Sequence, residues 1–289
     1  MSNSDEVRRL QAKANRQVGS HIPRWAWDSV VSIVIVSEKT LHQFATGALF
    51  QVGDQRFVVT AAHSLRIASG HSKTIGITCG SDSFLSVSGN WICSGPFQYD
   101  SVADPFDIAV FRIPDEFVPR FYSQRFIQLS EVNFDVLSSG VFVLFGYPGI
   151  WAAPSRSDDE KLVIKPLEYT AIGYAGPAAI EGYQPKLHFL LDANSDGISL
   201  SDGARAVLLK RDGSPAVFPR DLKGISGSPV WLVGDQRIPA GDWQSLPTGL
   251  AGVQTGVYQE NGVIRVTRWI AVTTLIYEAF PELRSALSL

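Results

Sequence analysis

The segment RDLKGISGSPVW, residues 220–231, places a serine among small residues. Gly224, Ser226 and Gly227 lie just before an apolar stretch with the composition of a β-strand. A serine hydroxyl becomes a nucleophile only when a base accepts its proton and hydrogen-bond donors stabilise the oxyanion that forms. The segment is equally compatible with a turn between strands. The choice depends on whether the chain supplies a histidine and a carboxylate.

Among the five histidines, His63 has the position expected of a general base. It follows the apolar run RFVVTAA, so it lies where a predicted strand ends and the chain turns. Ala61 and Ala62 are small and leave room around the ring. An exposed or hydrogen-bonded ring without a catalytic role is the simpler interpretation for the other four, His21, His42, His71 and His188.

Asp107 is the carboxylate with a suitable position to orient the histidine. It directly precedes the predicted strand IAVFRI. Partial burial at the mouth of a strand would strengthen its hydrogen bond to an imidazole. A purely structural aspartate in a turn is the alternative, and Asp104 fits the same turn equally well.

The order of these segments resembles a known family. TAAH, DIAV and GISGSP resemble the motifs of the chymotrypsin-like (trypsin-fold) serine peptidases, in particular the bacterial intracellular trypsin-like type, and the resemblance covers about residues 28–280. GYPG at 146–149 and the hairpin 45–63 are similar to further segments of that family. The 44 residues from His63 to Asp107 are usual for the family, whereas the 119 from Asp107 to Ser226 are more than usual.

The resemblance implies a role for each of these residues. Ser226 would be the nucleophile, His63 the general base and later the acid, and Asp107 the group that fixes the imidazole tautomer. The backbone N–H groups of Gly224 and Ser226 would form the oxyanion hole. Gly224 would permit the backbone conformation that this requires, and Gly227 would relieve crowding beside the nucleophile.

Substrate-binding residues are also implied by the resemblance. Arg220 would lie at the floor of the primary pocket and favour an acidic side chain before the scissile bond, although an orientation toward solvent is equally compatible with the sequence. The segment from Gln254 to Gly256 would pair with the substrate backbone as an added strand.

Ile225 departs from the pattern of those members that propeptide cleavage activates. Such members carry an aspartate just before the nucleophile, and its carboxylate binds the newly freed N-terminal ammonium. Isoleucine cannot form that ion pair. The sequence therefore predicts a site that needs no N-terminal zymogen cleavage.

The surrounding pattern is that of an all-β protein. Short segments rich in Val, Ile and Phe are separated by Gly, Asp, Ser and Pro, and no helices alternate with them. With the resemblance, this predicts two six-stranded antiparallel β-barrels. The predicted strands are 29–36, 44–52, 56–62, 74–79, 84–89 and 107–113 in the first half, and 141–147, 162–174, 187–193, 228–233, 248–258 and 263–272 in the second.

We expect three regions along the chain. Residues 1–27 would form a helical extension, with a helix over 4–18, and a linker. Residues 28–125 would form the first barrel with His63 and Asp107. Residues 126–289 would form the second barrel with Ser226, long insertions within 151–223, and a C-terminal helix over 273–287 that Pro281 kinks or restarts.

Composition excludes several other functions. A net charge of −3 over 289 residues gives no basic footprint for nucleic acid. No apolar run has membrane-spanning length, the N-terminus lacks the apolar region of a secretory signal, and no ligand set for a metal is recognisable. Cys79 and Cys93 are too few for a disulfide framework and are expected to be free thiols, although they could pair.

These observations predict a cytoplasmic serine endopeptidase without a cofactor. Its partners would be a protein or peptide substrate and a regulatory protein. One alternative is a catalytically dormant or partner-gated binding module on the same fold. A second is an unrelated β-rich protein in which His63, Asp107 and Ser226 lie far apart.

Overall fold

The computed structural model describes residues 18, 21–23 and 25–287, with gaps. The predicted helix over 4–18 lies outside the described residues apart from Val18, and so does Arg220. The gaps are 38–39, 70–73, 81–82, 88–90, 96–103, 137, 155–161, 175, 177–179, 181, 194–221, 239, 247 and 259.

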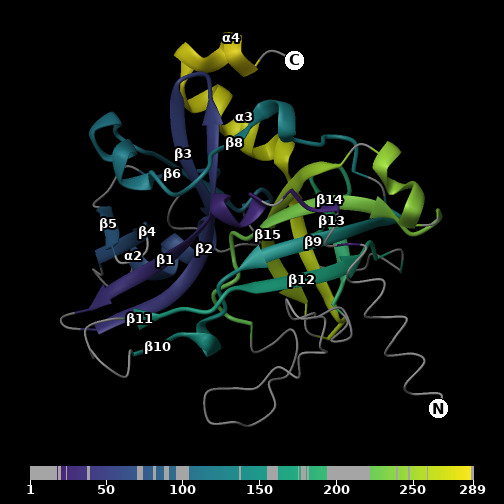
Figure 1. Cartoon of the computed structure of the whole chain (residues 1–289), viewed down its shortest axis with the longest axis horizontal. Helices are drawn as coiled ribbons and strands as arrows, with labels where there is room; N and C mark the ends of the chain where they lie inside the picture. Colours follow the sequence, from purple (N-terminus) through teal and green to yellow (C-terminus); the bar gives the residue numbers. More distant parts are fainter. Residues whose placement is uncertain are drawn as a thin grey trace.

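Two curled β-sheets form the described part of the chain, which confirms the predicted all-β class (Figure 1). The first sheet has the order β5-β4-β1-β2-β3-β7-β6, with β8 paired in parallel to β2. Its strands are β1 (Val30–Ser37), β2 (Thr40–Val52), β3 (Gln55–Ala61), β4 (Thr74–Cys79), β5 (Ser83–Val87), β6 (Trp91–Cys93), β7 (Ile108–Arg112) and β8 (Ile127–Gln128).

The second sheet is six-stranded, with the order β12-β9-β14-β15-β16-β13. All of its pairings are antiparallel. Its strands are β9 (Gly140–Gly146), β12 (Leu167–Ile172), β13 (His188–Asp192), β14 (Pro229–Asp235), β15 (Gly249–Tyr258) and β16 (Val263–Arg268). A separate short pair is formed by β10 (Ala153–Pro154) and β11 (Leu162–Val163).

Helices connect and cover the sheets. The α-helices are α2 (Ala62–Ser69), α3 (Trp269–Ala279) and α4 (Arg284–Leu287). The 3₁₀ turns are η1 (Ala26–Ser29), η2 (Asp115–Phe121), η3 (Leu129–Glu131), η4 (Gly149–Trp151), η6 (Ala240–Ser245) and η7 (Pro281–Leu283).

Strand β9 shows why apolar runs without polar alternation occur in this fold. Val141, Val143 and Phe145 belong to a core that includes residues of both sheets, whereas Phe142 and Leu144 belong to the core of the second sheet. Successive side chains of a strand point to opposite faces. Because both faces of β9 are buried, apolar residues occupy every position.

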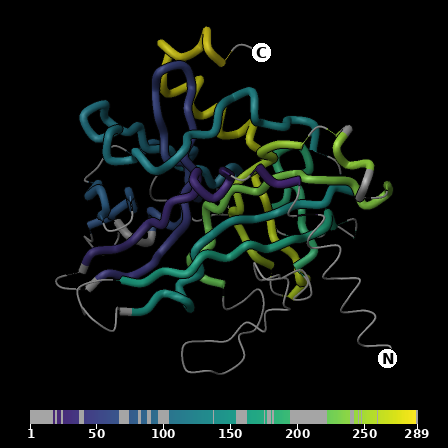
Figure 2. Tube along the Cα trace, in the orientation of Figure 1, coloured from purple at the N-terminus to yellow at the C-terminus, as the bar shows by residue number. Residues whose placement is uncertain are grey.

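The C-terminal helix closes the core between the sheets. Trp269 is 1% exposed, and its ring meets Phe50 edge-on at 5.2 Å between centroids. Val272 and Ile276 continue the buried face at helical spacing. The trace in Figure 2 shows the end of the chain returning to the first sheet, where Arg112 forms an ion pair with Glu282.

Several predicted elements differ from the observed ones. The segment 263–272 is a strand only to Arg268, and the helix begins at Trp269 because Trp269 must point into the inter-sheet core. The segment 162–174 is divided at Pro166, which cannot donate to a β-ladder. Pro281 restarts the helical path as predicted.

The first half also differs from the prediction. It has eight strands rather than six, since the short strands β6 and β8 join the sheet, and β8 extends it past residue 125 to Gln128. Helix α2 was not predicted. Its Ala62 and Leu65 are buried, so tertiary packing supports this short helix directly after β3.

Cys79 and Cys93 are both free, as the sequence predicts. Burial raises the pKa of the Cys93 thiol to about 11, so this side chain stays protonated at neutral pH. Within the described ranges, no helix has the length and apolar character needed to cross a membrane.

Candidate active site

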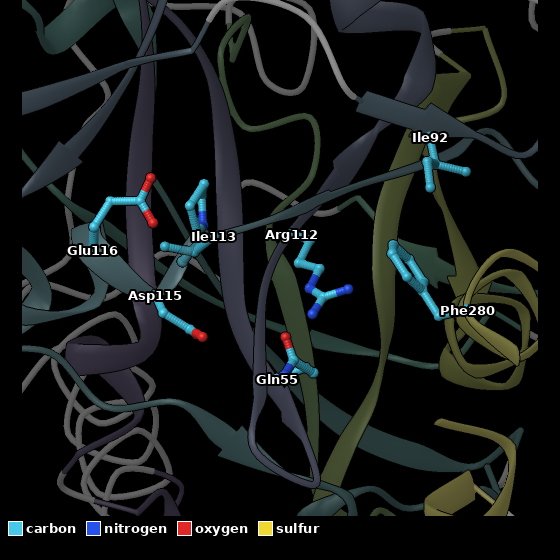
Figure 3. A pocket seen from close by; sticks show the side chains of 8 residues that line it. Gln55, Ile92, Arg112, Ile113, Asp115, Glu116 and Phe280 are labelled. Carbon is cyan, nitrogen blue, oxygen red and sulfur yellow. The ribbon is translucent and has the colours of Figure 1, made fainter. Parts of the chain in front are cut away.

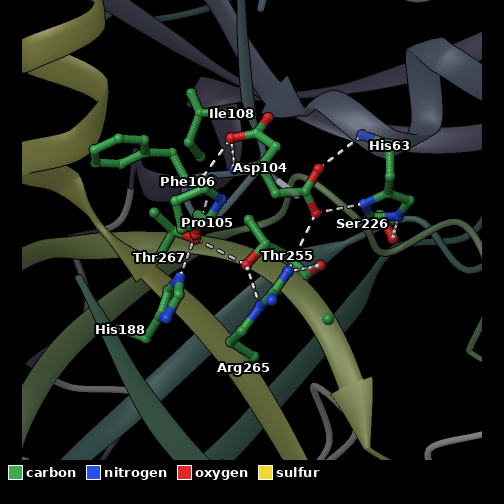
Figure 4. Close-up of polar contacts among 12 residues, drawn as sticks. His63, Asp104, Pro105, Phe106, Ile108, His188, Ser226, Thr255, Arg265 and Thr267 are labelled. Carbon is green, nitrogen blue, oxygen red and sulfur yellow. Dashed lines mark hydrogen bonds and ion pairs between the residues drawn. The ribbon is translucent and has the colours of Figure 1, made fainter. Parts of the chain in front are cut away.

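The structure brings His63, Asp107 and Ser226 together, although they are widely separated in the sequence (Figure 4). His63 Nδ1 lies 2.8 Å from Asp107 Oδ2, and His63 Nε2 lies 3.1 Å from Ser226 Oγ. The backbone N–H of His63 also donates to Asp107 Oδ1 at 2.8 Å. The first two residues come from the first sheet and its helix α2, whereas Ser226 belongs to the loop before β14.

Asp107 has an unusual backbone conformation and a buried side chain. Its φ is +52°, in the left-handed region that non-glycine residues adopt infrequently, and the residue is 0% exposed. The neighbouring Asp104 stabilises this turn, because its Oδ1 accepts the N–H groups of Phe106 at 3.2 Å and Asp107 at 3.1 Å. The strained turn directs the Asp107 carboxylate toward His63.

Asp104 has a structural environment distinct from that of Asp107. Ser94 Oγ lies 2.9 and 2.8 Å from its two carboxylate oxygens, and Arg66 forms an ion pair with it at 2.5 Å. Ser94 Oγ in turn accepts the N–H of Ile108 at 3.0 Å. The sequence offered Asp104 for the structural role in this turn, and the structure places Asp104 in that role while Asp107 contacts the His63 ring.

The nucleophile loop requires glycine at two positions. Gly224 has a φ of +101° and Gly227 a φ of +91°. A Cβ at Gly227 would overlap Thr46 O and Thr60 Oγ1, and a Cβ at Gly224 would lie 2.8 Å from Gly149 N. These glycines therefore allow the loop to approach the first sheet closely around Ser226.

We expect Gly227→Ala to lower the free energy of unfolding by about 3 to 5 kcal/mol, because it combines left-handed backbone strain with overpacking. Gly262→Ala is the matched control. Gly262 also has a positive φ, +63°, but a Cβ there would have no neighbour within 4 Å. The control should lose only about 1 to 2 kcal/mol. Urea unfolding of both variants measures the difference, and equal losses would contradict the close-packing explanation.

The backbone around Ser226 is held in a defined orientation. Lys223 O accepts the N–H of Gly149 at 2.7 Å, and Gly224 O accepts the hydroxyl of Thr46 at 2.8 Å. In a trans peptide the C=O and N–H point in opposite directions, so the N–H of Gly224 points away from Gly149. Within the described part of the chain, the N–H groups of Gly224 and Ser226 donate to no other group.

A polar network behind Asp107 was not foreseen from the sequence. Arg265 on β16 contacts Asp107 Oδ2 at 3.3 Å, and Thr267 Oγ1 donates to Phe106 O at 2.9 Å (Figure 4). The signal in the sequence is an arginine inside the apolar run VIRV, which indicates a buried partner. That partner lies 158 residues away, so local pattern could not identify it.

His188 supports the same turn from β13. Its Nδ1 accepts the N–H of Gln184 at 3.0 Å, so the ring proton is on Nε2, which donates to Pro105 O at 2.6 Å. Burial, followed by the positive charge of Arg265, lowers the pKa of His188 from 6.5 to about 4. His188 is therefore a buried, hydrogen-bonded ring, in agreement with its non-catalytic interpretation.

This pKa predicts a pH dependence of stability. The unfolded chain binds the His188 proton near pH 6.5 and the native protein only near pH 4, so acidification between these values favours unfolding. The stability contributed by neutral His188 is complete above about pH 6.5 and falls by at most about 1.4 kcal/mol per pH unit below it. Urea unfolding from pH 7 to pH 4 measures this effect. The free energy of unfolding should decline less steeply with falling pH in His188→Gln than in the native protein. If the free energy of unfolding has the same pH dependence in both proteins, His188 is not the buried neutral group that causes the decline.

The predicted substrate-binding residues are placed differently from the triad. Arg220 lies outside the described residues. The backbone N–H of Gln254 donates to Ser228 O at 2.9 Å and its C=O accepts the N–H of Gly227 at 2.8 Å, so its N–H is already engaged while its C=O keeps a second lone pair. The predicted pairing with a substrate strand stays a prediction. Gly256 is half-buried and is paired with Arg265 between β15 and β16.

The side-chain amide of Gln254 is only partly hydrogen-bonded. Its Nε2 donates to Gly256 O at 3.1 Å, while its buried Oε1 has no hydrogen-bond partner. An unsatisfied buried acceptor is costly.

A cavity of about 580 Å³ lies beside the first sheet, and Figure 3 shows the side chains that line it. It is lined by parts of the first sheet and by the end of α3, including Ile92, Arg112, Asp115 and Phe280. His63, Asp107 and Ser226 do not line it.

The sheets, their connections and the C-terminal helix define the chymotrypsin-like all-β fold. Among solved structures, GrC is 15% identical, with a TM-score of 0.50 over 90% of this chain and 97% of that chain. Human heparin binding protein is 15% identical, with a TM-score of 0.47 over 90% and 94%. The scabies mite inactivated protease paralogue S-I1 is 14% identical, with a TM-score of 0.48 over 89% and 96%.

Sequence comparison gives no match, either to protein-family models or to curated proteins. The likeness to GrC shows the fold alone, and a fold by itself does not define an activity. The geometry of the site is therefore the feature of this chain that bears on its function.

Proposed function

We propose that this protein is a serine endopeptidase that cleaves peptide bonds through Ser226, His63 and Asp107. The observation that carries the proposal is the continuous chain of contacts from Asp107 Oδ2 to His63 Nδ1, at 2.8 Å, and from His63 Nε2 to Ser226 Oγ, at 3.1 Å. Both distances allow proton transfer between a nucleophile, a base and the group that orients the base.

The reaction would be acyl transfer in two stages. His63 Nε2 takes the proton of Ser226 as Oγ attacks the substrate carbonyl, and the N–H groups of Gly224 and Ser226 stabilise the resulting oxyanion. The imidazolium then donates its proton to the leaving amine, which gives an acyl-enzyme. Water, deprotonated by His63, hydrolyses this ester and restores the free serine.

We further propose that the site needs no N-terminal cleavage. Ile225 is 2% exposed and belongs to the apolar core of the second sheet, together with Leu222. This packing, with the Gly149–Lys223 and Thr46–Gly224 hydrogen bonds, supports a loop that is formed without an ion pair to a new N-terminus. The bacterial intracellular subtype and a cytoplasmic location remain predictions of the sequence.

Restricted cleavage is part of the proposal. A peptidase formed without a propeptide in the cytoplasm must avoid unselective proteolysis, so we expect narrow specificity or control by a protein partner. Rapid degradation of unrelated unfolded proteins by the purified chain alone would contradict this expectation. A dormant or partner-gated binding module is the alternative function on the same fold.

The test is covalent labelling of the uncut chain with a fluorophosphonate probe, followed by peptide mapping. We expect a single adduct on Ser226, because only a serine with an adjacent base reacts quickly with such a probe. Prior heat denaturation should abolish labelling and is the control for non-specific reaction. An undenatured chain that remains unlabelled would exclude a preformed activated serine and favour the dormant module.

A further inference from the structure

Arg265 is a buried cation in contact with the candidate catalytic carboxylate. Its side chain is 5% exposed, that of Asp107 is 0% exposed, and Arg265 Nη2 lies 3.3 Å from Asp107 Oδ2. The same oxygen contacts His63 Nδ1 at 2.8 Å. His63 and Arg265 therefore share one carboxylate oxygen, and each reaches it from a different sheet.

The guanidinium of Arg265 is fixed by the strand next to its own. Its Nε donates to Thr255 Oγ1 and its Nη2 to Thr255 O, both at 3.2 Å, and its Nη1 lies 3.4 Å from the hydroxyl of Tyr258. Thr255 Oγ1 also contacts Thr267 Oγ1 at 2.9 Å. With these bonds the planar guanidinium has one defined position, which a flexible cation would not have.

The strand that fixes Arg265 also holds the nucleophile loop. On β15, Gln254 bonds to Gly227 at 2.8 Å and to Ser228 at 2.9 Å through its backbone, and Thr255 follows it directly. A short path of hydrogen bonds therefore connects Ser226, through β15 and Arg265, to Asp107. This path crosses between the sheets, and so does the contact between His63 and Ser226.

We propose that Arg265 is a positioning residue that holds Asp107, and through it the His63 ring, in register with Ser226. This inference rests on the proposed peptidase function for its catalytic consequence. The coupling of Arg265 to His63 through Asp107 can be measured without catalysis.

The positive charge of Arg265 makes its coupling to His63 measurable through the protonation of the His63 ring. A cation at Asp107 Oδ2 offsets part of the attraction of that carboxylate for a protonated His63 ring. Removal of the cation should therefore let the ring keep its proton to a higher pH. The other titratable or charged groups near Asp107 in the described structure are Asp104 with Arg66, neutral His188, Arg268 beyond it, and the protonated thiol of Cys93.

The experiment compares the native chain with Arg265→Met, Arg265→Lys and Arg268→Met. Nuclear magnetic resonance of histidine-labelled protein follows the protonation of the His63 ring against pH, with a His63→Gln sample for assignment. Arg268→Met is the matched control, because Arg268 lies on the same strand but contacts the ring of Phe189. Fluorophosphonate labelling rates are measured over the same pH range.

We expect Arg265→Met to raise the midpoint of the His63 titration by about half a pH unit or more. The pH at which the labelling rate falls on the acidic side should rise in the same way. At neutral pH the labelling rate should be roughly tenfold lower, because the His63 ring is less well placed. Arg265→Lys keeps the charge and should return the midpoint toward the native value. If the methionine variant does not fold, Arg265→Gln, which is also uncharged, takes its place with the same expected shift.

An unchanged His63 titration in Arg265→Met, or an equal shift in Arg268→Met, would overturn the inference. Suppose that the probe labels the native chain, and that Arg265→Met has the same His63 titration and the same labelling rate. The peptidase proposal then stands and the inference about Arg265 fails. If the titration shifts as expected but the native chain does not label, the coupling stands and the peptidase proposal fails.

Discussion

Ser226→Ala is expected to lower kcat for peptide hydrolysis by about 10⁶-fold while leaving stability nearly unchanged. The hydroxyl is the group that forms the acyl-enzyme, so its removal leaves only uncatalysed attack by water near the oxyanion donors. Its side chain has one hydrogen bond in the described structure, the 3.1 Å contact with His63 Nε2. Loss of a single half-exposed contact should change the free energy of unfolding by less than about 1 kcal/mol.

Ser228→Ala is the matched control for this prediction. Ser228 lies two residues further along the same loop, is 0% exposed, and its Oγ has no hydrogen-bond partner. Removal of this hydroxyl should leave kcat within about threefold of the native value. A fluorogenic peptide selected with the native chain serves as substrate. Retained hydrolysis in Ser226→Ala, or an equal loss in Ser228→Ala, would show that Ser226 is not the nucleophile.

Asp107→Asn is expected to lower kcat by about 10⁴-fold. Asp107 Oδ2 receives the ring N–H of His63, and an amide NH2 at that position would place the ring proton on Nε2 instead. A ring protonated on Nε2 cannot accept the proton of Ser226. Base catalysis would therefore be lost while the nucleophile stays in place.

The same substitution should also reduce stability. Both carboxylate oxygens of Asp107 accept from donors, Oδ1 from the backbone N–H of His63 and Oδ2 from His63 Nδ1 and Arg265. Neither position suits an NH2 group, so we expect a loss of about 1 to 3 kcal/mol in the free energy of unfolding. Activity assays and urea unfolding measure the two effects. Native-like kcat would rule out Asp107 as the orienting carboxylate.

Much of the fold was predictable because its signals are local. Strand β4 coincides with the predicted 74–79, and the left-handed backbone of Gly224 and Gly227 agrees with the need for glycine in a tight loop. Helix α2 was missed because packing of Ala62 and Leu65, rather than a repeating pattern, stabilises it. The C-terminal helix began too late in the prediction because burial of Trp269 is a tertiary contact.

The sequence by itself determined which residues could form a nucleophile, a base and an orienting carboxylate, and that short strands would carry them. It did so because glycine spacing, strand ends and apolar runs act over a few neighbouring residues. Only the tertiary structure decided that the Asp107 carboxylate reaches the His63 ring, that the backbone of Gln254 bonds to the nucleophile loop, and that Arg265 reaches the same carboxylate. The contacts of Asp107 with Arg265 and of His63 with Ser226 join the two sheets across 158 and 163 positions of sequence. Packing of the sheets, which no local pattern encodes, brings these residues within hydrogen-bond distance.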